Sequence, residues 1–111
     1  ISFGFVMGKL DKKKLRVAFR DAVFERDGYR CRVCGEGSTK LDAHHITDRK
    51  LMISGGYVEA NGITLCEECH RLAEKFHETG VSEPGYSPEE LYEKAASSYE
   101  EAVKASERLS K

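Results

Sequence analysis

Apolar residues recur with the period of an amphipathic helix near each end of the chain, and a shorter alternating pattern lies between them. Over residues 15–28 one apolar stripe predicts a helix, and Gly28 is a residue type that commonly ends one. Residues 1–14 contain glycines and then a run of lysines, and we expect a weakly ordered basic extension there. The stripe of the expected helix consists of Leu15, Ala18, Phe19, Ala22 and Val23.

The second helical pattern covers residues 87–110 and opens with a strong start signal. Ser87 can cap the first turn, Pro88 suits the first helical position, and Glu90 can complete a capping box. We therefore expect an acidic amphipathic helix within residues 81–111, packing on the domain or on a second copy of the chain. Its apolar stripe consists of Leu91, Tyr92, Ala95, Tyr99, Ala102, Val103 and Leu109.

The middle of the chain predicts two short strands followed by a helix. Residues 41–46 alternate between apolar and polar positions, and residues 62–65 form a second short apolar run. Residues 70–77 then place Leu72, Ala73 and Phe76 on one side of a helix. The fold class is therefore α+β, a small ββα domain over residues 15–80 with a helix on each side.

Four cysteines frame this unit as two pairs, each with two residues between its members. Paired knuckles of this spacing are typical of a tetrahedral zinc site; two disulfides are the alternative, but no secretory signal is visible. Zinc at such a site would contribute on the order of 10 kcal/mol to folding. In a chain of 111 residues, whose core is small, that is a large share of the stability. The cysteines are Cys31, Cys34, Cys66 and Cys69.

Charge is unevenly distributed although the net charge is only −1. The front of the chain is basic, while the part from Glu83 onward is acidic, which predicts a phosphate-facing surface and a separate solvated or partner-binding helix. An ordinary solvated helix face is the alternative. No apolar run is long enough to span a membrane, so we expect no membrane partner and a cytoplasmic protein. The residues expected to contact nucleic acid are Lys12, Lys13, Lys14, Arg16, Arg20, Arg30 and Arg32.

Three histidines are nested in the cysteine pattern: His44 and His45 lie between the pairs, and His70 follows the last cysteine. Imidazoles in these places can bind a second metal ion and accept a proton near neutral pH. A closed four-thiolate zinc site can do neither. The sequence thus separates one cluster for structure from another for chemistry.

The joint pattern resembles the HNH endonucleases of the cysteine-knuckle type, within the ββα-metal nuclease fold. The matching segments are Glu25-Arg-Asp-Gly-Tyr-Arg-Cys-Arg-Val-Cys34, Leu41-Asp-Ala-His-His-Ile46 and Asn61-Gly-Ile-Thr-Leu-Cys-Glu-Glu-Cys-His70. The resemblance implies that His44 and His70 bind the catalytic metal and that His45 is the general base. It also implies that Asn61 braces the loop carrying the base, and it places the acidic Asp42 near the base.

The resemblance further implies hydrolysis of DNA phosphodiester bonds with Mg²⁺, Mn²⁺ or another divalent ion. Glu74 or His77 could be a third protein ligand, and Glu74 is favoured because it lies one helical turn beyond His70. His77 could instead be a partly exposed histidine favoured by the helix dipole. Adjacent strand residues point to opposite faces, so the strand is expected to end or bulge at the histidine pair.

A zinc module that binds nucleic acid or protein without catalysis is the alternative function, and it would not need the three histidines together. We expect weak sequence preference because no DNA-reading appendage is evident. Small HNH proteins are frequent in phage genomes, which suggests a place in phage DNA packaging within the host cytoplasm. The partners would then be DNA and a packaging protein, or a second copy bound through the C-terminal helix.

Overall fold

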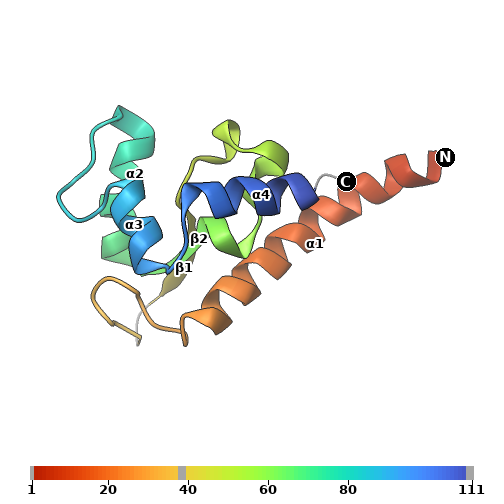
Figure 1. The fold of residues 1–111 in the computed structure, drawn as a ribbon. Coiled ribbons are helices and arrows are strands. Elements are labelled where there is room, and N and C mark those ends of the chain that lie inside the picture. Colours follow the sequence, from red (N-terminus) through yellow and green to blue (C-terminus); the bar gives the residue numbers. More distant parts are fainter. Residues whose placement is uncertain (1, 38–39, 110–111) are drawn as a thin grey trace.

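The two strands lie near the middle of the molecule, and the helix that follows them and the helices from both ends of the chain are arranged around them (Figure 1). The computed structural model describes residues 2–37 and 40–109, with side chains from residue 12 onward. The helices are α1 (Ser2–Arg26), α2 (Glu67–Thr79), α3 (Pro88–Lys94) and α4 (Tyr99–Leu109), and the strands are β1 (Leu41–His45) and β2 (Gly62–Cys66). Three short 3-10 turns, Arg49–Leu51, Ile53–Gly56 and Glu59–Asn61, fill the loop between the strands.

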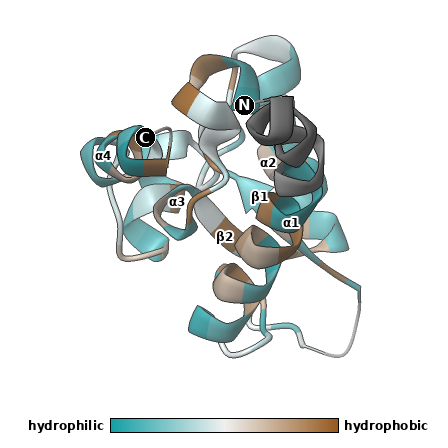
Figure 2. Ribbon diagram, turned by 90° about the vertical axis from the view of Figure 1, so that its right-hand side faces the viewer, coloured by the Kyte–Doolittle hydropathy of each residue, from teal (hydrophilic) through white to brown (hydrophobic). Residues whose placement is uncertain are grey.

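The predicted ββα unit and the α+β class are confirmed. Strands β1 and β2 pair antiparallel, with His44 opposite Ile63 and His45 opposite Gly62. All five residues of β2 are buried, and the strand lies between α1 and the C-terminal helices (Figure 2). A side chain at Gly62 would collide with Val23 and Phe19 of α1, so glycine is what lets this helix approach the end of the strand.

Helix α1 begins at Ser2 rather than near residue 15, so the predicted start of this helix is wrong and the described residues 2–14 belong to the same helix. The chain has no proline before Pro84, and single glycines cost a helix only about 1 kcal/mol each. Nothing in the sequence therefore forces a break between the lysine run and the predicted helix. Within the expected stripe, Phe19 and Val23 are buried, whereas Ala18 is exposed.

The single helix expected over residues 87–110 is instead two helices. Ala96 has a φ of 55°, and the N–H of Ser97 donates to the carbonyl of Tyr92, the arrangement that ends many helices in a left-handed residue. Ser98 then caps α4 by accepting from the N–H of Glu101. The capping box of α3, by contrast, is present as predicted.

The apolar stripe of α3 and α4 packs on its own domain. Leu91, Ala95 and Ala102 join Ile63 and Leu65 in one core cluster. Tyr99, which the sequence placed in the stripe, is exposed. The stripe was expected to pack either on the domain or on a second copy of the chain, and in the structure it packs on the domain. None of the described helices combines the length and apolar character needed to span a membrane.

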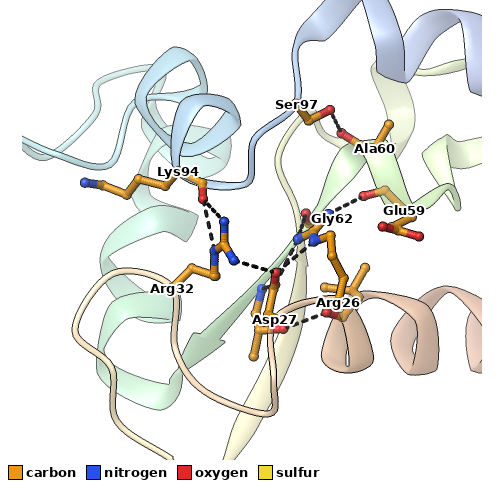
Figure 3. A network of polar contacts seen from close by, with 10 residues as sticks. Arg26, Asp27, Arg32, Glu59, Ala60, Gly62, Lys94 and Ser97 are labelled. Atoms are coloured by element: carbon orange, nitrogen blue, oxygen red, sulfur yellow. Dashed lines mark hydrogen bonds and ion pairs between the residues drawn. The ribbon is translucent and has the colours of Figure 1, made fainter.

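A polar network joins the end of α1 to β2 and α3 (Figure 3). The buried carboxylate of Asp27 accepts two hydrogen bonds from Arg26, at 2.7 and 2.8 Å, and one from the N–H of Thr64 at 2.9 Å. Arg32 lies 3.5 Å from the same carboxylate and donates to the carbonyl of Lys94 at 2.6 and 3.0 Å. Burial alone would raise the pKa of Asp27, but the hydrogen bonds from Arg26 and Thr64 outweigh it and lower that pKa.

Candidate metal sites and the histidine cleft

The four cysteines gather at one point, where the knuckle after α1 meets the start of α2. Their sulfur atoms all lie within 4.8 Å of one another, and all four thiols are free. The N–H groups of Cys34 and Cys69 each point at the first sulfur of their own pair, at 3.5 Å. This is a closed set of four thiolates, which suits a tetrahedral zinc ion and does not match two separate disulfides.

Tyr86 supports this cluster from the segment between α2 and α3. Its hydroxyl lies 3.2 Å from the sulfur of Cys69. Burial and the neighbouring sulfur raise the pKa of Tyr86, so the hydroxyl keeps its proton and can donate to the sulfur of Cys69. No sequence pattern signals this contact, because a tyrosine in a Pro-Gly loop is usually interpreted as a packing residue.

The histidines line a separate open cleft of about 460 Å³. Residues of α1 form one wall, β1 forms the floor, and α2 forms the opposite wall. Residues of the loop after β1 also line the cleft. The cleft is lined by Arg16, Phe19, Arg20, Asp42, His44, His45, Asp48, Arg49, Tyr57, His70, Glu74 and His77, with Val17 and Ala43.

His44 and His45 point to opposite walls of this cleft, as adjacent strand residues should, and β1 ends at His45 as expected. His44 turns toward α2 and is only 1% exposed, yet neither ring nitrogen has a hydrogen-bond partner among the described residues. Its Nδ1 faces Glu74 Oε2 at 3.3 Å. Burial lowers the pKa of His44, so the ring is neutral and has a lone pair available for a metal.

His70 lies between two carboxylates. Its Nε2 is 3.3 Å from Glu74 Oε2, and its Nδ1 is 3.3 Å from Asp42 Oδ2. A single oxygen of Glu74 is thus equally close to His44 and His70. Ligands of one tetrahedral ion, each at about 2.1 Å, lie roughly 3.4 Å apart, so these contacts have the scale of a metal site.

Asp42 therefore contacts a metal-ligand candidate rather than the base, which is not where the sequence placed it. A carboxylate that accepts from the second nitrogen of a metal-binding histidine fixes the tautomer of that ring.

His77, which the sequence left open, also enters the cleft: it is stacked on His44 with ring centres 5.1 Å apart, and its Nε2 donates to the carbonyl of His45 at 2.9 Å.

The ring of His45 is held between aromatic side chains. It stacks on Phe19, with centres 4.3 Å apart, and meets Tyr57 edge-on at 4.9 Å. Its buried Nε2 has no hydrogen-bond partner among the described residues. Burial, and then the charge of Arg49, lower the pKa of His45 to about 4, well below the value near 6.5 expected from the sequence. The ring is consequently neutral at physiological pH.

Asn61 is fully buried and ties the loop after β1 to the rest of the domain. Its side-chain amide donates to the carbonyls of Thr47 and Gly56, at 3.0 and 3.3 Å. Its Oδ1 accepts from the N–H of Thr47 at 2.9 Å and from the hydroxyl of Tyr92 at 2.7 Å. Thr47 lies two residues after His45, so Asn61 sits where a brace for that loop is needed.

The basic residues expected to contact nucleic acid fall into separate groups. Arg16 and Arg20 line the histidine cleft, and Lys12 lines an adjoining hollow together with Arg49 and Lys50. Lys13 and Lys14 border a different hollow on α1. The other two are used internally: Arg30 donates to the carbonyl of Gly35, and Arg32 belongs to the Asp27 network.

Sequence reasoning missed the roles of Arg49, which lines the cleft, and of Tyr92, which contacts Asn61. Arg49 follows the histidine pair by four residues and donates to the hydroxyl of Tyr57 at 2.6 Å, a pairing no spacing rule reveals. Tyr92 was assigned to an apolar stripe, although a buried tyrosine needs a partner for its hydroxyl, and that requirement was the available signal.

Comparison with known protein families gives a match for the central part of the chain. Residues 31–76 match the family model described as HNH endonuclease. The matched segment begins at the first cysteine and includes both cysteine pairs, His44, His45, His70 and Glu74. The cysteine cluster fits the zinc-binding form of this motif. No curated protein and no solved structure matches the chain. A phage origin stays a prediction.

Proposed function

We propose that this chain, which carries an HNH domain, is an endonuclease that hydrolyses phosphodiester bonds of DNA with the aid of a divalent metal ion. One observation carries the proposal: a buried, unpaired imidazole and a carboxylate face each other within the same cleft as a second unpaired imidazole. The first imidazole is that of His44, the carboxylate is that of Glu74, and the second imidazole is that of His45. Buried nitrogens without partners are costly, and they persist where a metal or a substrate will use them.

His44, His70 and Glu74 are the residues that would hold the ion. Their two nitrogens and one oxygen leave coordination positions free, as a catalytic site requires. When bound, the ion supplies a positive charge for a phosphate oxygen and for the leaving 3′-oxygen. Asp42 keeps the ring of His70 oriented by accepting from its Nδ1. Mg²⁺ and Mn²⁺ both remain candidates for this position.

His45 takes the proton from the attacking water at its unpaired Nε2. A pKa of about 4 makes the ring a weak base in the DNA-free protein, but it also guarantees that the ring is unprotonated at neutral pH. A phosphate bound beside the ring brings negative charge, which favours the imidazolium and raises the pKa as the reaction needs. Phe19 and Tyr57 hold the ring in place while this occurs.

Asn61 fixes the position of the base, His45, in the cleft. Three of its four hydrogen bonds go to Thr47 or Tyr92, and Ile46 donates in addition to the carbonyl of Asn61 at 2.8 Å. The loop following His45 is therefore attached to β2 and α3 at the point where the chain leaves the strand. Such positioning matters because small displacements of a catalytic group cost large factors in rate.

Nucleic acid is the substrate class because the cleft combines these groups with cations on α1 and on the loop after β1, and the match to HNH endonucleases favours DNA. Lys12, Arg16 and Arg20 are four residues apart and share one helix face, and Arg49 and Lys50 lie across from them. These side chains suit phosphates rather than base edges, so cleavage depends little on sequence. Association with a packaging protein or with a second copy rests on the sequence alone.

Conversion of supercoiled plasmid tests the function. Protein that has kept its cysteine-bound zinc but has been treated with a mild chelator should leave the plasmid intact, and added Mg²⁺ or Mn²⁺ should restore nicking or linearisation. Protein that binds the plasmid but never cuts it with any of the ions would favour the alternative, a zinc module that binds nucleic acid without catalysis.

A further inference from the structure

We propose that His77 is an additional ligand of the catalytic metal, so that this chain's site takes two histidines and a glutamate from α2 as well as His44 from β1. The inference rests on the proposed function and deepens it by defining the ligand set. His77 lies seven residues beyond His70 and three beyond Glu74, which places all three on one face of α2.

The hydrogen bond of His77 determines which nitrogen is available. Its Nε2 contacts the backbone carbonyl of His45 at 2.9 Å, and a carbonyl oxygen can only accept. Nε2 therefore carries the proton, and in the neutral ring Nδ1 is left with a free lone pair. A backbone carbonyl that fixes one nitrogen in this way is the usual partner of a metal-binding histidine.

The surroundings of His77 point to the same ion. One donor atom each from His44, Glu74 and His77 can be chosen so that all three lie within 4.8 Å of one another. The rings of His44 and His77 have centres 5.1 Å apart, and both lie on the side of β1 that faces α2. His44 has two unpaired ring nitrogens at 1% exposure, so a group that satisfies them is required at this position.

The dipole interpretation of His77 does not account for these contacts. A histidine that merely profits from the end of a helix would stay near the last carbonyls of its own helix. Here Gly80 closes α2 by donating to the carbonyl of Phe76, while His77 reaches across to β1.

A site with three imidazoles and one carboxylate has consequences for the choice of ion. Imidazole nitrogens suit transition metals such as Mn²⁺, Co²⁺, Ni²⁺ and Zn²⁺, whereas Mg²⁺ prefers oxygen ligands. Removing His77 should therefore weaken binding of a nitrogen-preferring ion more than binding of Mg²⁺.

Calorimetric titration with Co²⁺ tests the assignment on protein whose cysteines are already filled with zinc. We expect His77→Ala and His77→Gln each to weaken Co²⁺ binding on the order of 10–100-fold or more, as loss of even outer partners of a metal does. The His77→Gln variant is informative because a glutamine side chain retains an N–H for the carbonyl of His45 but has no imidazole nitrogen. Unchanged Co²⁺ affinity in both variants, with or without lost cleavage, would overturn the proposal and leave His77 as a positioning residue for His45.

A measurement on the unaltered chain covers the case in which the variants do not fold. In ¹⁵N-labelled protein with zinc at the cysteines, further Zn²⁺ should shift the Nδ1 resonance of His77, and an unmoved resonance would contradict the proposal. The two hypotheses separate cleanly. His77-dependent ion binding without plasmid cleavage would refute the nuclease function, whereas cleavage with His77-independent ion binding would refute only the ligand assignment.

Discussion

The cysteine cluster and the histidine cleft share one helix but differ in the groups that surround their ligand atoms. Cys69 and His70 are neighbours on α2, and each belongs to a different site. The four sulfurs lie beside one another, and backbone N–H groups and the hydroxyl of Tyr86 contact them. The cleft mixes nitrogen and oxygen donors, leaves buried nitrogens unpaired and is open to solvent. A closed set fixes structure, while an open set leaves positions for substrate.

Because both sites use α2, we expect the histidine cleft to depend on the cysteine cluster more than the cluster depends on the cleft. The cysteine cluster anchors the first turn of α2, and His70, Glu74 and His77 follow within the next two turns. Loss of the cluster should therefore displace the cleft ligands as well. Loss of the partly exposed His70, in contrast, removes a side chain that lies outside the core.

The largest effect is expected for Cys31→Ser or Cys69→Ser. Either change should remove zinc binding that contributes on the order of 10 kcal/mol, and so unfold or aggregate the domain. Circular dichroism and the zinc content of the purified variant measure this. A folded, active Cys69→Ser protein would show that the cluster is not what holds the fold.

His45→Ala should reduce cleavage roughly 10²–10⁴-fold, because only the proton acceptor is removed. Zinc content and DNA affinity should remain close to those of the unaltered protein, while loss of the ring between Phe19 and Tyr57 should lower the melting temperature. Single-turnover cleavage at saturating DNA is the decisive measurement. Near-normal turnover would rule out His45 as the base and shift attention to the other groups in the cleft.

The contrast between the two sites also explains what the sequence could predict. Cysteine spacing identified a closed site completely, because ligand type and number are both written in the motif. The same approach predicted His44, His45 and His70 for one site, and all three line one cleft. It favoured Glu74 over His77 as the third ligand because Glu74 is one helical turn from His70, although both fit the helical period. Asp42 was placed near the base by the resemblance alone, whereas alternation along β1 puts it on the face of His44, where it contacts His70.

Contacts between distant segments were the least predictable. The hydrogen bond from Tyr92 to Asn61 joins residues 31 apart in the chain, and Arg32 was assigned to DNA although it serves the Asp27 network. The break at Ala96 was hidden because alanine is a strong helix former, and only the backbone bonds that end α3 reveal why it adopts a positive φ.

Two tyrosines allow a matched comparison of the sites, since each donates to one of them. Tyr92→Phe leaves the buried Oδ1 of Asn61 with one donor fewer, which should cost about 1–3 kcal/mol of stability and lower the cleavage rate without loss of zinc. Tyr86→Phe should instead weaken zinc retention against a chelator and leave the cleavage rate of zinc-loaded protein nearly unchanged. Equal effects of both variants on both readouts would contradict the separation of the sites.

The smallest effect concerns how DNA is held. Replacing Lys12, Arg16 and Arg20 with glutamine should weaken binding and reduce the slope of log K against log salt by roughly 0.9 for each lost phosphate contact. The same charge change at Lys94, Lys104 and Arg108, which lie on α3 and α4, is the control and should alter the slope little. A salt titration of binding to a short duplex distinguishes them, and equal slopes would mean that α1 does not face DNA.

The central claim is that the chain holds two metal ions in two different ways, and anomalous diffraction from crystals soaked in Mn²⁺ tests it most directly. The account predicts zinc at the four cysteines and a separate manganese peak within bonding distance of both His44 and His70. Zinc at the cysteines with no manganese between these two histidines would contradict it.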